Sequence, residues 1–277
     1  MPDRPPFVSF LSDYGLVDEF VGVCHAVMLD VTPDLRIVDI THEVAPFDVR
    51  AGALALVRAV QYLPDGVVLA VVDPGVGTER RCVAVEVEGG FLVGPDNGLL
   101  APAVAMLGGP VRIVALENPD YQLVAPGPTF AGRDVMAPAA AYLARGVPID
   151  ALGAPVDPAG LAPGLVPLPG ENEDGTIGGE VLWVDRFGNC QLNVAPEQLV
   201  DRGVAPGGFV GVTIGGEDRR AHWVTAFAEA KPSELALLVD SYGMCALAFD
   251  QRSAAAELKL RAGKSVTLVP LPGGGHE

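Results

Sequence analysis

Basic residues are scarce in this sequence, which has 18 Lys and Arg against 35 Asp and Glu and a formal net charge of −17 at pH 7. A general nucleic-acid binder needs clustered Lys and Arg for its phosphate contacts, so this balance argues against one. Long apolar runs are missing as well, and without one the chain is not expected to span a bilayer. The first residues, MPDRPPFVSF, lack the charged and apolar regions of a signal peptide. We therefore expect a cytoplasmic protein with no nucleic-acid or membrane partner.

Cysteine and histidine each occur only four times. The cysteines are far apart in sequence and form no CxxC pair: Cys24, Cys82, Cys190 and Cys245. Such cysteines are typical of buried, reduced thiols rather than of disulfides or metal sites. Three of the histidines have no metal-ligand spacing with one another: His25, His222 and His276. The fourth, His42, is isolated, and a lone histidine is more often a packing residue than a catalyst. The sequence therefore predicts no metal and no organic cofactor.

The composition, 49% hydrophobic and 19% charged, is that of a globular protein long enough for one large domain or two modest ones. Residues 1–160 alternate short β-rich runs with helical patterns. Strands are expected at residues 7–11, 36–40, 66–72, 82–87, 90–94 and 111–116. Helices are expected at residues 19–30, 48–63 and 135–146. This alternation predicts an α/β N-terminal domain with a mostly parallel sheet and helices on both faces.

The composition changes after residue 160. Residues 161–178 are rich in Pro and Gly and are expected to form a linker. Residues 179–277 carry short strand candidates and almost no helical pattern. The candidates are residues 180–185, 190–194, 209–214, 235–240 and 265–270. We therefore predict an all-β C-terminal domain, either a sandwich or a barrel.

Acidic residues follow the first expected strand in SFLSDYGLVDEF. Ser12, Asp13 and Asp18 lie at the carboxyl edge of the sheet, where the ligand sites of α/β proteins gather. Two aspartates there could accept hydrogen bonds from ribose hydroxyls or from an ammonium group. An Asx turn followed by a helix N-cap is an alternative explanation of the same residues.

The stretch VVDPGVGTERR follows another expected strand and turns at once. It lacks the GK[ST] of a Walker nucleotide site, so its glycines do not indicate a phosphate loop of that kind. If the turn folds back, Asp73 and Arg80 can form a charge-assisted carboxylate–guanidinium contact. The alternative is a surface salt bridge, which stabilises a protein little.

Two turns of the β domain carry further candidates. In WVDRFGNCQLN, Asp185, Phe187 and Asn189 alternate along an extended segment. Facing one way, they would offer an acceptor, a ring and an amide, which suits a purine or an amino acid. A β turn at RFGN explains them as well. Ser241 and Gly243 stand at the second turn, in DSYGMCALAF.

Seven stretches, taken in order, resemble the S-adenosylmethionine (SAM) hydroxide adenosyltransferases, which are relatives of the fluorinating and chlorinating SAM enzymes. They are SDYGLVDEFVG, ITHEVAPFDVRAGA, VVDPGVGTERR, GPDNGLL, PTFAGRD, VDRFGN and SYG. The resemblance covers both domains. It implies a homotrimer whose ligand lies between the N-terminal domain of one chain and the C-terminal domain of its neighbour.

The resemblance also implies roles for residues of the N-terminal domain. Asp13 would hold the ribose hydroxyls, and Asp18 would bind the methionine ammonium group. Phe47 would pack near the ribose and the sulfonium, and Thr129 would lie beside the 5′ carbon.

Residues of the neighbouring chain would complete the site. Asp185 and Ser241 would contact the methionine end of the ligand. Phe187 and Asn189 would meet the adenine, and Phe227 would add a second ring against the purine.

The implied reaction is in-line displacement at the 5′ carbon by water, giving adenosine and methionine. Hydrolytic members use Asp, Arg and His to hold that water, and Asp73 and Arg80 match the first two. The same members read TFHGRD where this chain reads TFAGRD, so Ala131 takes the place of the histidine. Halogenating relatives carry a tyrosine in place of Asp73, and a carboxylate there would repel a halide.

Three functions follow from this comparison. The first is a SAM hydrolase that is impaired because Ala131 replaces the histidine. The second is a pseudoenzyme that binds SAM or adenosine without significant turnover. The third is halide-dependent adenosyl transfer, which the carboxylate of Asp73 disfavours.

Overall fold

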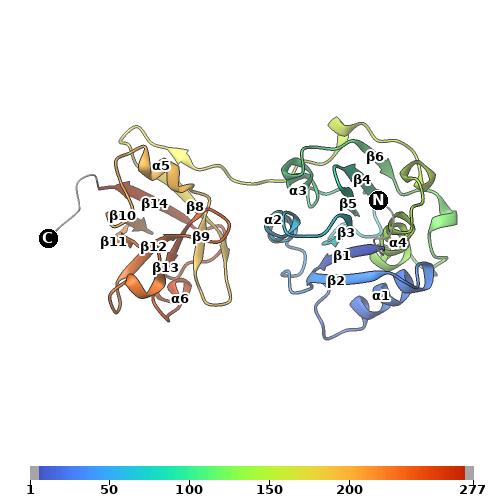
Figure 1. The fold of residues 1–277 in the computed structure, drawn as a ribbon, viewed down its shortest axis with the longest axis horizontal. Coiled ribbons are helices and arrows are strands. Elements are labelled where there is room, and N and C mark those ends of the chain that lie inside the picture. The colour runs from blue at the N-terminus through green and yellow to red at the C-terminus, as the bar shows by residue number, and fades with distance from the viewer. Residues whose placement is uncertain (1–5, 272–277) are drawn as a thin grey trace. The chain divides into compact units, whose positions relative to one another are not determined.

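The computed structural model describes residues 6–271, and the chain divides into two compact units, Met1–Val166 and Pro167–Glu277 (Figure 1). The division falls within the Pro- and Gly-rich stretch of residues 161–178. Within the described part of the chain, no helix has the length and apolar character needed to cross a membrane.

A six-stranded sheet forms the centre of the first unit. Its strands are β1 (Phe7–Ser12), β2 (Arg36–Thr41), β3 (Gly66–Val71), β4 (Cys82–Val87), β5 (Gly90–Pro95) and β6 (Arg112–Ala115). They lie in the order β2-β1-β3-β5-β4-β6, and β4 runs antiparallel to both of its neighbours. The sheet is therefore mixed rather than simply parallel. The reason is local, because only two residues join β4 to β5 and so short a connection can form only an antiparallel hairpin.

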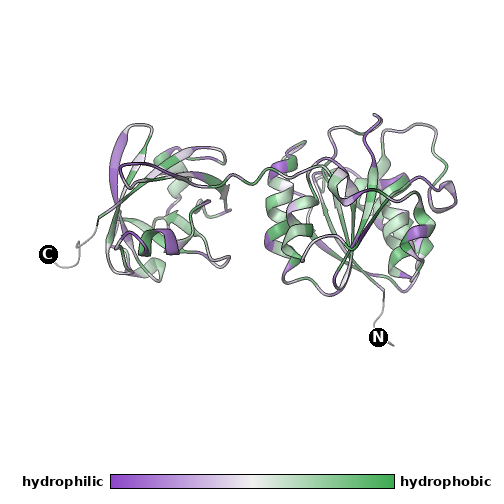
Figure 2. Ribbon diagram, turned by 90° about the horizontal axis from the view of Figure 1, so that it is seen from above, coloured by the Kyte–Doolittle hydropathy of each residue, from purple (hydrophilic) through white to green (hydrophobic). Residues whose placement is uncertain are grey.

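Helices cover both faces of this sheet, as the sequence predicts (Figure 2). They are α1 (Phe20–Val31), α2 (Val49–Val60), α3 (Ala101–Met106) and α4 (Ala137–Ala144). Neighbouring residues of β1 show the division, since successive side chains of a strand point to opposite faces. Phe10 packs with Met28 of α1 in one buried cluster, and Leu11 packs with Leu56 of α2 in another.

The second unit is a closed β-barrel. Its strands are β7 (Gly170–Glu171), β8 (Ile177–Val184), β9 (Cys190–Leu192), β10 (Phe209–Ile214), β11 (Glu217–Trp223), β12 (Leu235–Val239), β13 (Cys245–Ala248) and β14 (Ser265–Pro270). The order is β14-β10-β11-β12-β13-β9-β8, and β14 pairs with β8 as well as β10, which closes seven strands into a ring. The strand β7 adds to β8 outside the ring.

Several elements of the barrel unit differ from the sequence expectation. The strand β11, EDRRAHW, has no apolar alternation over its first half, because those side chains are exposed. The strand β13 consists of the small buried residues CALA, which carry a weak strand signal. Two short helices are also present, α5 (Pro196–Val200) and α6 (Ala254–Leu258). Short 3₁₀ helices occur in the first unit at Pro119–Tyr121, Ile149–Leu152 and Pro158–Gly160, and in the barrel unit at Phe227–Glu229.

Candidate ligand-binding site

A pocket of about 400 Å³ opens at the carboxyl ends of β1 and β3. These strands are parallel neighbours, so the residues that follow them meet at one edge of the sheet. Five residues that the sequence singles out line this pocket: Asp13, Phe47, Asp73, Thr129 and Ala131. Asp18 is not among its lining residues and lies exposed in the loop before α1.

Asp13 contributes a partly buried carboxylate to the pocket. Its Oδ2 accepts a hydrogen bond of 2.8 Å from the backbone N–H of Phe47. Burial raises the pKa of Asp13, and this effect outweighs the lowering by backbone hydrogen bonds, while the charge of Asp73 raises the pKa further. A ligand that donates hydrogen bonds or carries positive charge would relieve this unfavourable ionisation.

Phe47 adopts a backbone conformation that bulky residues rarely occupy. Its φ is +68°, in the left-handed region. Two backbone hydrogen bonds hold it there, from its own N–H to Asp13 and from the N–H of Val49 to its carbonyl at 3.0 Å. The ring is 71% exposed at the rim of the pocket. Such strained residues concentrate at ligand sites, and here the conformation leaves an apolar residue exposed where it lines the pocket.

Asp73 and Arg80 form a two-pronged ion pair. Arg80 Nε donates to Asp73 Oδ1 at 2.6 Å, and its Nη2 donates to Oδ2. The side chains are only 6% and 14% exposed, so this is not a surface salt bridge. Burial alone would lower the pKa of Arg80, but the hydrogen bond and charge of Asp73, together with Cys82, raise it. Two hydrogen bonds therefore hold Arg80 against Asp73, which lines the pocket.

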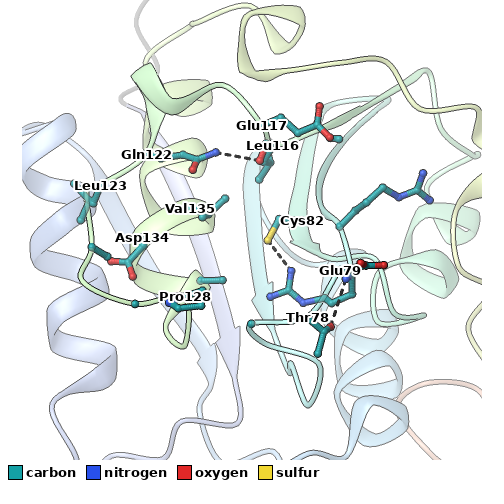
Figure 3. A pocket seen from close by; sticks show the side chains of 17 residues that line it. Thr78, Glu79, Cys82, Leu116, Glu117, Gln122, Leu123, Pro128, Asp134 and Val135 are labelled. Carbon is teal, nitrogen blue, oxygen red and sulfur yellow. Dashed lines mark hydrogen bonds between the residues drawn. The ribbon is translucent and has the colours of Figure 1, made fainter.

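A second pocket of about 590 Å³ lies on the other side of this ion pair. Figure 3 shows the segment of Thr78, Glu79 and Cys82 facing the segment of Pro128, Asp134 and Val135 across it. Arg80 lines this pocket and donates from Nη1 to Cys82 Sγ at 2.8 Å. Ala131 lines both pockets and is itself 9% exposed. Its methyl group thus borders open space beside the carboxylate–guanidinium pair.

The chain around Ala131 is more irregular than the sequence predicts. A π-helical turn, Gly132–Met136, precedes α4 where the sequence indicates a plain α-helix from residue 135. π-helical turns often occur at functional sites. A Cβ on Gly132 would overlap the hydroxyl of Tyr14, so only glycine fits at this close approach.

An aromatic cluster supports this turn. Ring centroids lie 5.6 Å apart for Tyr14 and Phe130, 5.2 Å for Phe20 and Phe130, and 5.8 Å for Tyr14 and Phe20. All three line the pocket of Asp13. Burial raises the pKa of Tyr14 well above its usual value, so its hydroxyl stays protonated. Sequence reasoning missed these residues, although Tyr14 and Phe20 adjoin the two aspartates of the first motif.

The barrel unit has a pocket of its own, of about 430 Å³. Phe187, Asn189 and Phe227 line it, as a site for a planar ring would require. Residues 249–253 complete the lining, and no feature of the sequence pointed to them. Phe187 is 78% exposed, which leaves its ring free to stack.

Asp185 does not project its carboxylate into this pocket. Its Oδ1 accepts from the backbone N–H groups of Phe187 and Asn189 at 2.9 and 2.8 Å, and its Oδ2 accepts from the Asn189 side chain at 2.7 Å. Asp185 therefore shapes the turn that presents the other two residues. For Phe187 and Asn189, the two interpretations of this motif, a β turn and a ligand contact, are compatible.

Ser241 lies in a second turn with the same design. Asp240 Oδ1 accepts from the N–H groups of Tyr242 and Met244, and each turn has a glycine with positive φ, Gly188 and Gly243. Strand pairing places the two turns at opposite ends of β9, since Cys190 pairs with Leu247 while Val194 bonds Cys245. Ser241 is exposed and is not among the lining residues of the Phe187 pocket.

Comparison with known proteins gives matches along most of the chain. Residues 8–153 match the N-terminal domain of the SAM hydroxide adenosyltransferases, and residues 179–267 match the C-terminal domain. A protein of Salinispora tropica named (R)-S-adenosyl-L-methionine hydrolase is 45% identical over 250 residues, covering 90% of this chain and 92% of its own. A fluorinase of an Actinoplanes species is 27% identical and covers 95% of this chain and 97% of its own. The crystal structure of a conserved protein from Thermotoga maritima has a TM-score of 0.88 at 32% identity, with 95% and 99% coverage.

Proposed function

Because the chain belongs to the SAM hydroxide adenosyltransferase family, we propose that it hydrolyses S-adenosyl-L-methionine to adenosine and L-methionine. The observation that carries this proposal is the buried Asp73–Arg80 pair on the pocket that also holds Asp13, Phe47 and Thr129. The relatives that support it are named for the (R) form of SAM, and we propose the same sulfonium epimer as the preferred substrate.

The chemistry asks little of the protein beyond positioning a water molecule. The water oxygen bonds to the 5′ carbon while the bond from that carbon to sulfur breaks. The electron pair goes to sulfur, which leaves as the neutral thioether of methionine, and the water loses a proton. Bulk water has a pKa of about 15.7, so local electrostatic help and exclusion of solvent are needed. The Asp73–Arg80 pair would orient the water, with the carboxylate accepting its proton.

The turnover is proposed to be slow. Both oxygens of the Asp73 carboxylate are already engaged by Arg80, and the imidazole that hydrolytic relatives would add is replaced by the methyl group of Ala131, which cannot accept a proton. Acid–base help by a side chain contributes about 10²–10⁴-fold to rate, which is the loss expected here. The alternative is a pseudoenzyme that binds SAM or adenosine without significant turnover.

Binding is assigned to both units. Asp13 would accept the ribose hydroxyls, Phe47 and Thr129 would flank the ribose and 5′ carbon, and Asp18 would bind the ammonium group. In the barrel unit, Phe187, Asn189 and Phe227 would bind the adenine. Asp185 would stabilise the turn that carries Phe187 and Asn189, and Ser241 would contact the methionine end. We propose that the two sets meet in a homotrimer, between neighbouring chains.

Product analysis tests the proposal. The purified protein is incubated separately with the (R) and (S) epimers of SAM, and adenosine and methionine are quantified by chromatography. Stoichiometric release of both, faster from the (R) epimer, supports slow hydrolysis. Saturable binding without release would instead establish the pseudoenzyme.

A halide control separates the third possibility. Products that change when chloride or fluoride is added would indicate adenosyl transfer to halide, which the carboxylate of Asp73 disfavours. Incorporation of ¹⁸O from labelled water into the 5′ hydroxyl of adenosine would identify water as the nucleophile.

A further inference from the structure

Two histidines and an aspartate form a cluster at β2, on residues that the proposed hydrolysis does not use. His25 belongs to α1, Asp39 to β2, and His42 follows β2. The ligand atoms of all three lie within 4.8 Å of one another. His25 Nε2 lies 2.9 Å from Asp39 Oδ1, and His42 Nε2 lies 3.1 Å from the same oxygen. Three metal-ligating side chains therefore converge on one point.

The cluster arises from the fold. Ile37 of β2 packs in the buried cluster that contains α1. Asp39 is two residues further along the strand and so points to the same face, toward His25. Since the three residues come from different elements, their sequence spacing gives no metal-binding pattern, and the prediction from sequence could not find them.

His42 carries the strongest signal. Its side chain is 2% exposed, and its Nδ1 lies 2.7 Å from Ser12 Oγ in a buried hydrogen bond. Its Nε2 is buried and has no hydrogen-bond partner, because Asp39 Oδ1 lies within ion-pair distance but outside hydrogen-bond geometry. Buried polar atoms are nearly always hydrogen-bonded, so a buried nitrogen that lies at ion-pair distance from a carboxylate but has no hydrogen bond is an atom that a bound ion would satisfy.

We propose that His25, Asp39 and His42 form a site for a divalent first-row transition ion of the zinc type. Neutral imidazole nitrogens and one carboxylate suit such an ion, whereas Mg²⁺ and Ca²⁺ prefer oxygen ligands. Three protein ligands with water in the remaining position is the pattern of open zinc sites.

The geometry fits with a small adjustment. Four-coordinate Zn²⁺ with ligand bonds of about 2.0–2.1 Å sets its ligand atoms about 3.3 Å apart. The separations from Asp39 Oδ1 to the two histidine nitrogens, 2.9 and 3.1 Å, need to widen slightly, and the two nitrogens, which lie within 4.8 Å of each other, need to reach the same spacing. His25 and Asp39 are 27% and 43% exposed, so an ion can enter from solvent. Ser12 would act as the outer partner that orients the imidazole of His42.

The ion would fasten α1 to the end of β2. The backbone carbonyl of His42 accepts a hydrogen bond from Gly15 at 2.8 Å, so the same attachment reaches the loop that follows β1. The site thus links α1, β2 and the loop after β1 beside the pocket of Asp13 and leaves one position open for water, and its existence does not depend on the proposed hydrolysis.

Calorimetry with Zn²⁺ tests this site. The full-length chain is stripped with a chelator, desalted and titrated with Zn²⁺ at neutral pH, and Co²⁺ is added in parallel to record its visible spectrum. We expect one Zn²⁺ per chain and the intense visible bands of four-coordinate Co²⁺. The variants His25→Ala and Asp39→Asn should lose this binding, while both remain folded because the two side chains are partly exposed.

The matched control is His222→Ala, which removes the histidine of a His–carboxylate pair on the barrel unit, where His222 Nδ1 lies 3.3 Å from Glu234. It should bind Zn²⁺ as the unaltered chain does. Ser12→Ala should weaken binding about 10–100-fold through loss of the outer partner. Absence of stoichiometric Zn²⁺ binding overturns the proposal, and so does binding that persists unchanged in both His25→Ala and Asp39→Asn.

Discussion

Ala131 separates two pockets, and the charged pair of Asp73 and Arg80 connects them. A methyl group at this position can neither donate nor accept a proton. Ala131 lines both pockets, so a larger side chain at this position would extend into one of them. At the scale of single residues, the proposed hydrolysis therefore depends on what position 131 lacks as much as on what Asp13 and Asp73 would supply.

Restoring the imidazole is the direct test of that dependence. We expect Ala131→His to release adenosine from SAM about 10²–10⁴-fold faster, because an imidazole beside the ion pair would hold and deprotonate the water. Single-turnover kinetics with quantified adenosine measure the change. Ala131→Leu is the control, since it fills the space without adding a base and should give no increase. Equal rates for Ala131→His and the unaltered chain would remove position 131 from the mechanism.

The ionised carboxylate of Asp13 is expected to lower the stability of the fold but to strengthen ligand binding. Its pKa is raised mainly by burial, so its ionised form at neutral pH destabilises the folded state. We expect Asp13→Asn to melt at a higher temperature than the unaltered chain at neutral pH. This difference should shrink as the pH falls through the raised pKa of the folded state, and it should level off below the usual value of 3.8, where the carboxyl is protonated in both the folded and the unfolded state. Melting curves against pH measure it.

The same substitution should weaken ligand binding. Loss of a charge-assisted hydrogen bond to the ribose is worth about 1.5–3 kcal/mol, or roughly ten- to a hundredfold in SAM affinity. Glu43 is exposed and is not among the lining residues of the pocket, so Glu43→Gln is the control and should change neither melting nor affinity. A lower melting temperature for Asp13→Asn at neutral pH would show instead that the carboxylate of Asp13 stabilises the folded state.

At the scale of elements, the π-helical turn Gly132–Met136 positions the residues around Ala131. It lies against the ring of Tyr14, which is held by Phe20 and Phe130. The turn is therefore coupled through packed rings to the loop that carries Asp13. A regular α-helix over the same residues would turn their side chains to other directions relative to the pocket.

Gly132→Ala tests the coupling. The added Cβ would overlap the Tyr14 hydroxyl, and we expect a loss of about 1–3 kcal/mol in the free energy of unfolding from forced repacking. Denaturant titration measures it. Gly22→Ala in α1 is the matched control, because its Cβ would meet nothing within 4 Å, and it should be neutral or stabilising. Adding Tyr14→Phe to Gly132→Ala should recover part of the loss, and no recovery would place the strain elsewhere.

At the scale of the whole molecule, the residues proposed to bind SAM are divided between two units with separate hydrophobic cores. The pocket of Asp13 offers two carboxylates and several aromatic rings, while the pocket of Phe187 offers rings and an amide. The proposed homotrimer would supply each ligand with one pocket from each of two chains.

Mixed assemblies test this arrangement. Asp13→Ala and Asn189→Ala should each weaken SAM binding at least tenfold, so that neither variant alone shows occupied sites at a SAM concentration near the Kd of the unaltered chain. Unfolded together in equal amounts and refolded, they should regain about one quarter of the binding sites, because random pairing joins intact N-terminal and barrel units in that share of interfaces. Equilibrium dialysis with SAM counts the sites. Complete absence of regained sites would show that each ligand is bound within one chain, and sedimentation would give the number of chains.

The sequence by itself determined the two-unit organisation, the helices on both faces of the first sheet and the family. These follow from local periodicity and from the order of motifs, which no folding step can alter. It also indicated that Asp13, Phe47, Asp73, Thr129 and Ala131 belong together, and the structure places them on one pocket.

Only the tertiary structure decided features that depend on pairing between distant segments. The pairing of β14 with β8 makes the second unit a barrel rather than a sandwich. The polar strand β11 can be recognised only from its pairing with β10 and β12. The carboxylate of Asp185 accepts hydrogen bonds from residues of its own turn. The cluster of His25, Asp39 and His42 likewise exists only because α1 packs over β2. The physical reason is common to all of these, since a contact between remote residues is set by packing of the elements and leaves no periodic trace in either segment.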